Sequence, residues 1–168
     1  MRRVKLLQRE WGNVIFLLSA LLVVAADQLS KLWIRSNLAL GESLFEIGFF
    51  RLIRVHNSGS AFGLFQGQSL LLTIIALVGV AVILLYVFVF HHKFPFLDNW
   101  RGRLALGLVL GGIAGNLIDR IYLGYITDFI GFSFWPAFNI ADSAIVVGTI
   151  ILAHSLICLA RAGTCQDG

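Results

Sequence analysis

Residues 70–90 read LLLTIIALVGVAVILLYVFVF and contain no charged side chain. The hydrocarbon core of a bilayer is about 30 Å thick, so an α-helix needs about 20 apolar residues to cross it. This stretch therefore predicts a transmembrane helix. The composition supports that interpretation, because 58% of the 168 residues are hydrophobic and only 13% are charged. Soluble domains carry about 25% charged residues.

Three further apolar segments reach a similar length: residues 14–34, 104–123 and 137–159. We expect a single integral membrane domain over residues 1–168, because this length leaves no room for a second folded domain. The first segment has an alternative interpretation, since MRRVKLLQR resembles the basic start of a cleavable signal peptide. A retained helix is favoured because the apolar pattern resumes beyond Asp27.

Basic residues precede the first segment, lie between the second and third, and follow the fourth. The positive-inside rule places these regions, and both termini, in the cytoplasm. The net charge of +4 then reflects membrane orientation, and no nucleic-acid partner is expected. The two cysteines, Cys158 and Cys165, have no metal-type spacing and suggest no disulfide framework.

The outer stretch 38–55 mixes apolar and charged residues in near alternation. This pattern predicts short strands at the membrane interface. The second outer loop carries Phe132, Phe134 and Trp135, which favour anchoring at the headgroup level. We therefore expect an all-α membrane protein with four transmembrane helices and a small extracytoplasmic β/loop platform between the first and second helices.

Four aspartates fall near the outer ends of these segments in this orientation. They are Asp27, Asp119, Asp128 and Asp142. Placing a carboxylate at membrane depth costs free energy, so such residues by default suggest a functional site. Glycines at 107, 111 and 115 form a smooth stripe on the third segment, and Asp119 continues it by four residues. Asp119 therefore faces a helix interface. Its neighbours Asn116 and Arg120 serve either as structural support, with an Asp–Arg tie, or in the chemistry.

Further polar residues lie close to these aspartates in the sequence. Asp27 and Lys31 are four residues apart and can pair, with Lys31 extending outwards to water. Asn139, Asp142 and Ser143 share one helical face. Asn139 is near a helix cap, whereas Asp142 is expected to lie too deep for capping alone.

The motif NSGSAF precedes the second helix. Its Asn57 can reach the polar site, and its Gly59 permits a turn, although an ordinary loop explains both. His154 lies deep in the fourth segment and is expected to be a satisfied core residue.

Asp128 lies in an aromatic loop that is a poor setting for a solvated carboxylate. If this loop folds back, Asp128 and Asp142 can meet and share one proton. Such a pair can activate water and protonate a scissile carbonyl. A proton relay or transporter is the alternative, but it needs ionisable groups at successive depths, which the inner halves of the second and third segments lack. A membrane scaffold would explain only the glycines.

Five motifs resemble the lipoprotein signal peptidase family, signal peptidase II, and occur in that family's order. They are DQLSK (27–31), NSGSAF (57–62), GGIAGNLIDR (111–120), TDF (127–129) and PAFNIADS (136–143). The resemblance covers essentially the whole chain. The sequence departs from the family at Ser60, which adds a hydroxyl where the family often has alanine.

The resemblance implies an aspartic endopeptidase of the bacterial inner membrane, active near its outer face. It would cleave diacylglyceryl-modified prolipoproteins just before the lipidated cysteine, with Asp128 and Asp142 as the catalytic pair. The expected supporting residues are Asp27, Lys31, Asn57, Gly59, Asn116, Asp119, Arg120, Asn139 and Ser143. The family uses no metal or cofactor and is inhibited by globomycin. The expected partners are the prolipoprotein and membrane lipid, and the expected state is a monomer.

Overall fold

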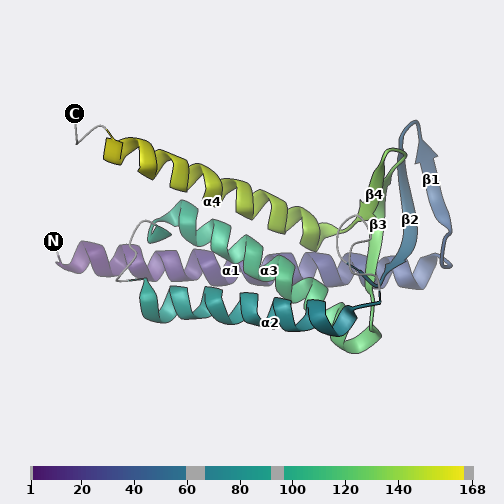
Figure 1. Cartoon of the computed structure of the whole chain (residues 1–168), viewed down its shortest axis with the longest axis horizontal. Helices are drawn as coiled ribbons and strands as arrows, with labels where there is room; N and C mark the ends of the chain where they lie inside the picture. Colours follow the sequence, from purple (N-terminus) through teal and green to yellow (C-terminus); the bar gives the residue numbers. More distant parts are fainter. Residues whose placement is uncertain (1, 60–66, 92–96, 165–168) are drawn as a thin grey trace.

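A computed structural model gives the structure of the chain over residues 2–59, 67–91 and 97–164. Four helices lie alongside one another, and a small sheet covers one end of the bundle (Figure 1). The helices are α1 (Arg2–Asn37), α2 (Ser69–Leu85), α3 (Trp100–Leu123) and α4 (Ile140–Thr164), and a π-helical turn, η2 (Tyr86–Phe90), continues α2. The start of α1 and the end of α4 lie at the end away from the sheet. Ser60 and Cys165 are outside the described residues.

Each of the four helices is long and apolar enough to cross a membrane in the described part of the chain. The candidate spans are Glu10–Asn37, Ser69–Phe90, Trp100–Leu123 and Ile140–Cys158. This confirms the expected fold class of four membrane helices with a small sheet. His154 is exposed on α4, so the expectation of a core residue is wrong. Few side chains of α4 are buried, because most of its surface faces away from the other helices.

The glycine stripe brings α3 against α1. A methyl group at Gly107 would lie 2.5 Å from the Phe16 carbonyl oxygen, and one at Gly111 would lie 2.7 Å from that of Ala20. Only glycine permits so close an approach of two backbones. The stripe therefore packs as predicted and directs Asp119, one turn further, into the protein, where it is fully buried.

The sheet has four antiparallel strands in the order β1-β2-β3-β4. They are β1 (Ser43–Ile47), β2 (Phe50–Asn57), β3 (Ile126–Phe132) and β4 (Trp135–Phe138). The strands expected within 38–55 are present, but the second outer loop adds β3 and β4 to them. Asp128 therefore lies on a strand, opposite Val55, and its prediction as a loop residue is wrong. The reason is that the open edge of β2 has backbone groups that the 126–132 segment can satisfy.

The sheet is attached to the end of α1. The Arg54 guanidinium on β2 donates to the carbonyl oxygens of Arg35, at 3.1 Å, and Leu38, at 2.9 Å. These carbonyls lie at a helix C-terminus, where they have no partner within the helix. Phe129 of β3 packs beside them against Ile34 and Leu38. The strand that carries Asp128 is thereby held next to α1.

Candidate active site

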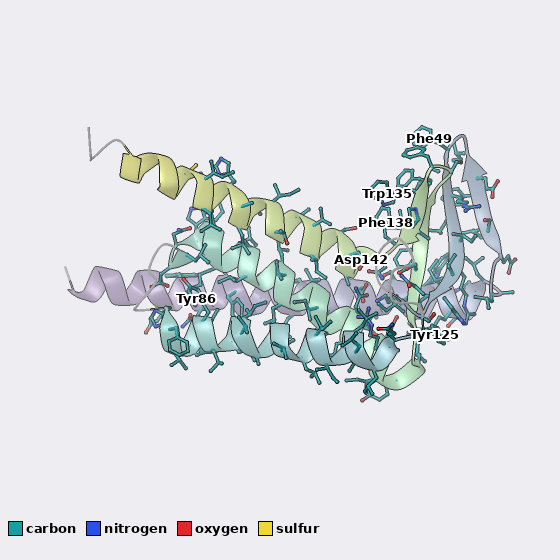
Figure 2. The ribbon with its side chains drawn as sticks, in the orientation of Figure 1. Phe49, Tyr86, Tyr125, Trp135, Phe138 and Asp142 are labelled. Atoms are coloured by element: carbon teal, nitrogen blue, oxygen red, sulfur yellow. The ribbon has the colours of Figure 1, made fainter. Side chains whose placement is uncertain are left out.

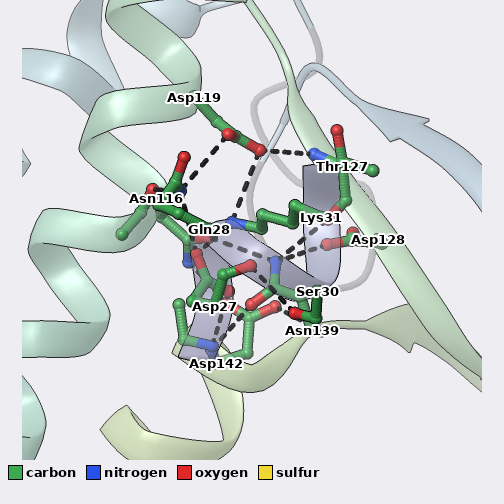
Figure 3. Close-up of polar contacts among 12 residues, drawn as sticks. Asp27, Gln28, Ser30, Lys31, Asn116, Asp119, Thr127, Asp128, Asn139 and Asp142 are labelled. Carbon is green, nitrogen blue, oxygen red and sulfur yellow. Dashed lines mark hydrogen bonds and ion pairs between the residues drawn. The ribbon is translucent and has the colours of Figure 1, made fainter. Parts of the chain in front are cut away.

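The four aspartates come together where the sheet meets the helices (Figure 3). The polar residues of this cluster come from α1 (Asp27, Gln28, Lys31), α3 (Asn116, Asp119), β3 (Thr127, Asp128) and the start of α4 (Asn139, Asp142). Most of them are fully buried, including Asp27, Lys31 and Asp119. Elements far apart in the sequence therefore form one connected polar network.

Asp142 and Asn139 form a reciprocal cap at the start of α4. The Asn139 side-chain oxygen accepts from the Asp142 backbone N–H at 2.9 Å, and Asp142 Oδ2 accepts from the Asn139 backbone N–H at 3.3 Å. Asp142 thus lies in the first helical turn, and the expectation of a deeper position is wrong. The helix begins late because β4 occupies the preceding residues. Asn116 Nδ2 completes the surroundings of Asp142 by donating to its Oδ1 at 2.7 Å.

Asp128 is only 2% exposed and accepts from two amide side chains. Asn139 Nδ2 lies 2.7 Å from its Oδ1, and Asn57 Nδ2 lies 2.9 Å from its Oδ2. Asn57 is itself oriented by the Gly59 N–H, which donates to its side-chain oxygen at 3.0 Å. Asn139 therefore contacts both Asp128 and Asp142 with a single side chain.

The environment of Asp128 favours its protonated form. Burial first, and then the neighbouring charge of Asp142, raise the pKa of Asp128 to about 7, while the hydrogen bonds from Asn57 and Asn139 act in the opposite direction. Asp128 therefore holds a proton for much of the time near neutral pH. Two such carboxyl groups in one site can divide the acid and base roles between them.

Lys31 points inwards and is completely buried. Its Nζ lies 2.8 Å from Asp27 Oδ2, 3.0 Å from Asn116 Oδ1 and 3.4 Å from Asp119 Oδ2. The expectation that Lys31 extends outwards to water is wrong. Buried carboxylates on two helices stabilise its charge within the protein, so the side chain has no need to reach solvent.

Asp27 and Asp119 each hold the backbone next to one member of the Asp128–Asp142 pair. Asp27 Oδ1 accepts from the N–H of Ala141 at 3.0 Å. Asp119 Oδ2 accepts from the N–H of Thr127 at 2.9 Å. Lys31 contacts both of these supporting carboxylates. The network therefore couples the position of β3 to that of the first turn of α4.

Arg120 does not form the expected tie to Asp119. Its Nη2 donates instead to the Gly59 carbonyl oxygen at 3.3 Å. Asp119 pairs with Arg35, whose Nη1 lies 3.3 Å from Asp119 Oδ1. Arg35 was not among the predicted site residues, although it continues the four-residue spacing of Asp27 and Lys31 along one helical face.

Ser143, a predicted site residue, and Gln28, a neighbour of Asp27, both donate hydrogen bonds to backbone carbonyl groups. The Ser143 hydroxyl donates to the Asn139 carbonyl oxygen at 3.0 Å, within its own helix. Gln28, which was not predicted, donates to the Gly115 carbonyl oxygen at 3.0 Å. Both therefore reinforce the elements that carry the site.

A cavity of about 900 Å³ opens beside this network. Its polar wall includes both Asp128 and Asp142, together with Asn57 and Arg120. Its apolar wall comes from three helices and from β4, and includes Leu72, Ile75, Ile113, Val146, Trp135 and Phe138. Figure 2 shows Trp135 and Phe138 projecting from the sheet on the side of α4. The cavity thus offers two carboxyl groups and an apolar surface to one ligand.

The described residues contain no group of three His, Cys, Asp or Glu side chains arranged to hold a metal ion. His56 lines the cavity and stacks on Tyr125 with ring centroids 3.6 Å apart. Burial, and secondarily Arg54, lower the pKa of His56, so its imidazole is neutral near pH 7.

A family model described as signal peptidase (SPase) II matches residues 19–158. The chain belongs to the signal peptidase II family. A lipoprotein signal peptidase from Moorella thermoacetica is 48% identical over 143 residues, which cover 84% of this chain and 92% of that protein. One from Dehalococcoides mccartyi is 47% identical over 138 residues, covering 82% and 86% of the two chains.

Solved structures agree with this family assignment. A bacterial membrane enzyme structure obtained by the in meso method at 2.3 Å resolution superposes with a TM-score of 0.75 and is 28% identical. The match covers 84% of this chain and 87% of that one. Signal peptidase II is a protease. The four apolar helices of this chain are those of a multi-pass membrane protein. The peptidase interpretation is therefore favoured over a relay or scaffold.

Proposed function

We propose that the chain is an aspartic endopeptidase that removes the signal peptide from diacylglyceryl-modified prolipoproteins. It cleaves on the N-terminal side of the lipidated cysteine, with Asp128 and Asp142 as its catalytic residues. The observation that carries this proposal is that both carboxyl groups line one cavity and are joined through Asn139. The names of the relatives supply the class of substrate.

The charges around the site balance when the pair holds one proton. Asp27, Asp119, Asp128 and Asp142 are the carboxylates, and Lys31, Arg35 and Arg120 are the cations that contact them or line the same cavity. One proton on an aspartate makes the two signs equal. Because the pKa of Asp128 is about 7, we assign the proton to Asp128 and the ionised, basic role to Asp142.

The reaction then follows from these two protonation states. Asp142 takes a proton from water as the water oxygen bonds to the scissile carbonyl carbon, and Asp128 donates its proton to the carbonyl oxygen. The resulting tetrahedral diol collapses as its carbon–nitrogen bond breaks. Asp142 gives its proton to the leaving nitrogen, and a hydroxyl of the diol returns a proton to Asp128. Both residues regain their starting states, so no other reactant is required.

The shape of the cavity fits a lipid-tailed substrate. Its apolar wall can hold acyl chains or the signal helix, while its polar wall holds the peptide bond and water. In the proposed orientation both termini are cytoplasmic, and the sheet lies at the extracytoplasmic face of the inner membrane. We take α1 as a retained helix of a single membrane domain, because it supplies Asp27 and Lys31 to the site. We further propose that the enzyme acts as a monomer and uses no metal. Globomycin-type inhibitors would occupy the same cavity as the substrate.

The test is cleavage of a purified diacylglyceryl-modified prolipoprotein by the detergent-solubilised protein. Wild type is compared with Asp128→Asn and Asp142→Asn, and the unlipidated precursor serves as the control substrate. We expect cleavage of the lipidated precursor by wild type alone, with all three proteins equally helical by circular dichroism. Cleavage by either variant at the wild-type rate would contradict the assigned pair. Proton flux through reconstituted wild type without cleavage would favour the relay.

A further inference from the structure

Arg35 reaches the active-site network from the last turns of α1. Its Nη1 lies 3.3 Å from Asp119 Oδ1 and 3.1 Å from Thr127 Oγ1. Its side chain is 20% exposed, whereas Asp119 is completely buried. One nitrogen of Arg35 therefore joins a carboxylate of α3 to the strand residue that precedes Asp128.

Thr127 is held through three of its atoms. Its N–H donates to Asp119 Oδ2, its hydroxyl oxygen accepts from Arg35, and its carbonyl oxygen accepts from Asn139 Nδ2 at 3.5 Å. Asp128 follows directly in the chain, so these contacts determine where its carboxyl group lies. Misplacement of a catalytic group by about 1 Å can cost about a hundredfold in rate.

Arg35 also contributes to the charge balance of the site. Asp119 lies between two cations, Lys31 at Oδ2 and Arg35 at Oδ1. Loss of Arg35 would leave the four carboxylates with only the charges of Lys31 and Arg120 close by. A less positive surrounding favours proton uptake by an acidic pair.

We propose that Arg35 is a positioning residue for the peptidase reaction. It fixes the part of β3 that carries Asp128, and its charge sets the pH range over which the Asp128–Asp142 pair is active. This inference rests on the proposed function. The ionisable groups around Asp128 come from each neighbouring element: Asp27, Lys31 and Arg35 on α1, Arg54 and His56 on β2, Asp119 and Arg120 on α3, and Asp142 on α4. Burial keeps His56 neutral near pH 7, and Arg35 is the cation that contacts Thr127, the residue directly before Asp128.

The test separates the two effects of Arg35 with four variants. Arg35→Leu removes both contact and charge, Arg35→Lys keeps the charge, Thr127→Val removes only the hydroxyl contact, and the fourth combines Arg35→Leu with Thr127→Val. Arg51→Leu is the matched control, because Arg51 is an exposed arginine on β2 outside the network. For each protein, kcat and KM for the lipidated prolipoprotein are measured from pH 5 to pH 9.

We expect Arg35→Leu to lower kcat by about tenfold or more with little change in KM. We also expect the alkaline limb of its pH–rate profile, where activity falls as pH rises, to move to higher pH by about half a unit or more. Arg35→Lys should restore the limb, and Thr127→Val should lower kcat without moving it. The double variant should lose less than the product of the two single losses, because both act on one contact.

The proposal is overturned if Arg35→Leu and Arg51→Leu have the same kcat and the same alkaline limb. Amide hydrogen exchange of wild type and the Arg35 variants provides a readout independent of cleavage. Faster exchange at Thr127 and Asp128 in Arg35→Leu supports the positioning role even if wild type cleaves nothing, a result that would remove only the proposed function. Unchanged exchange there overturns the positioning role. If Arg35→Leu does not fold, Arg35→Lys and Thr127→Val decide the question by the same measurements.

Discussion

Asn139 donates a hydrogen bond of 2.7 Å to Asp128 while its side-chain oxygen caps the helix that carries Asp142. The two functions of this side chain can be separated by substitution. Serine at a helix cap still accepts from the backbone N–H, but it has no amide donor for Asp128. A serine and an alanine variant should therefore differ in stability but share the loss of activity.

The free energy of unfolding of Asn139→Ala should be about 1 kcal/mol lower than that of Asn139→Ser, because alanine lacks the cap that serine keeps. Both should lose about tenfold or more in kcat/KM, because each lacks the hydrogen bond to Asp128. Denaturant unfolding and prolipoprotein cleavage measure the two quantities. Wild-type activity in Asn139→Ser would mean that the amide contact has no role in the reaction.

The pKa of Asp128, at about 7, predicts the alkaline limb of the reaction. If protonated Asp128 is the acid, kcat/KM should fall as pH rises through about 7 and should approach a tenfold loss per unit above it. The measurement is the pH–rate profile between pH 6 and pH 9, with circular dichroism at each pH as a control for unfolding. A flat profile over this range would contradict the assignment of the proton to Asp128.

The same raised pKa predicts a pH-dependent change in stability. An acid whose folded-state pKa exceeds its unfolded value of 3.8 destabilises the protein increasingly as pH rises from about 4 to about 7. Asp128→Asn removes that cost, which is at most about 4 kcal/mol. The Tm of the variant should thus exceed that of wild type by an amount that grows over this range and is constant above it. A Tm difference that shrinks with rising pH would contradict the sign.

The close approach of α1 and α3 predicts that a larger side chain at the glycine stripe lowers the stability of the fold. Gly111→Ala would place a methyl group 2.7 Å from the Ala20 carbonyl oxygen and should destabilise the fold by about 1–3 kcal/mol. Gly79→Ala is the control, because its nearest neighbour, Ile113 Cδ1, would be at an ordinary 3.4 Å. Thermal unfolding in detergent measures both. Equal Tm values would mean that the helices can separate at no cost.

Several features of the fold and site could be predicted because they depend on local periodicity. An uncharged run such as 70–90 has to be helical in a membrane, since a helix satisfies its own backbone hydrogen bonds. The four-residue spacing of Gly107, Gly111 and Gly115 likewise predicted the buried direction of Asp119, as the structure confirms. Asn139 was correctly predicted to lie near a helix cap.

Composition and local periodicity specify which segments are apolar, which face of the third helix is smooth and which acidic residues fall near one end of the bundle. Three features become visible only in the folded chain: β3 pairs with β2, Lys31 points inwards, and Arg35 rather than Arg120 pairs with Asp119. The difference lies in the range of the interactions along the chain. Helical periodicity acts within a few residues, whereas strand pairing and the solvation of a buried charge depend on partners about 70 to 90 residues away in the chain, such as Asp128 for Val55 and Asp119 for Lys31 and Arg35.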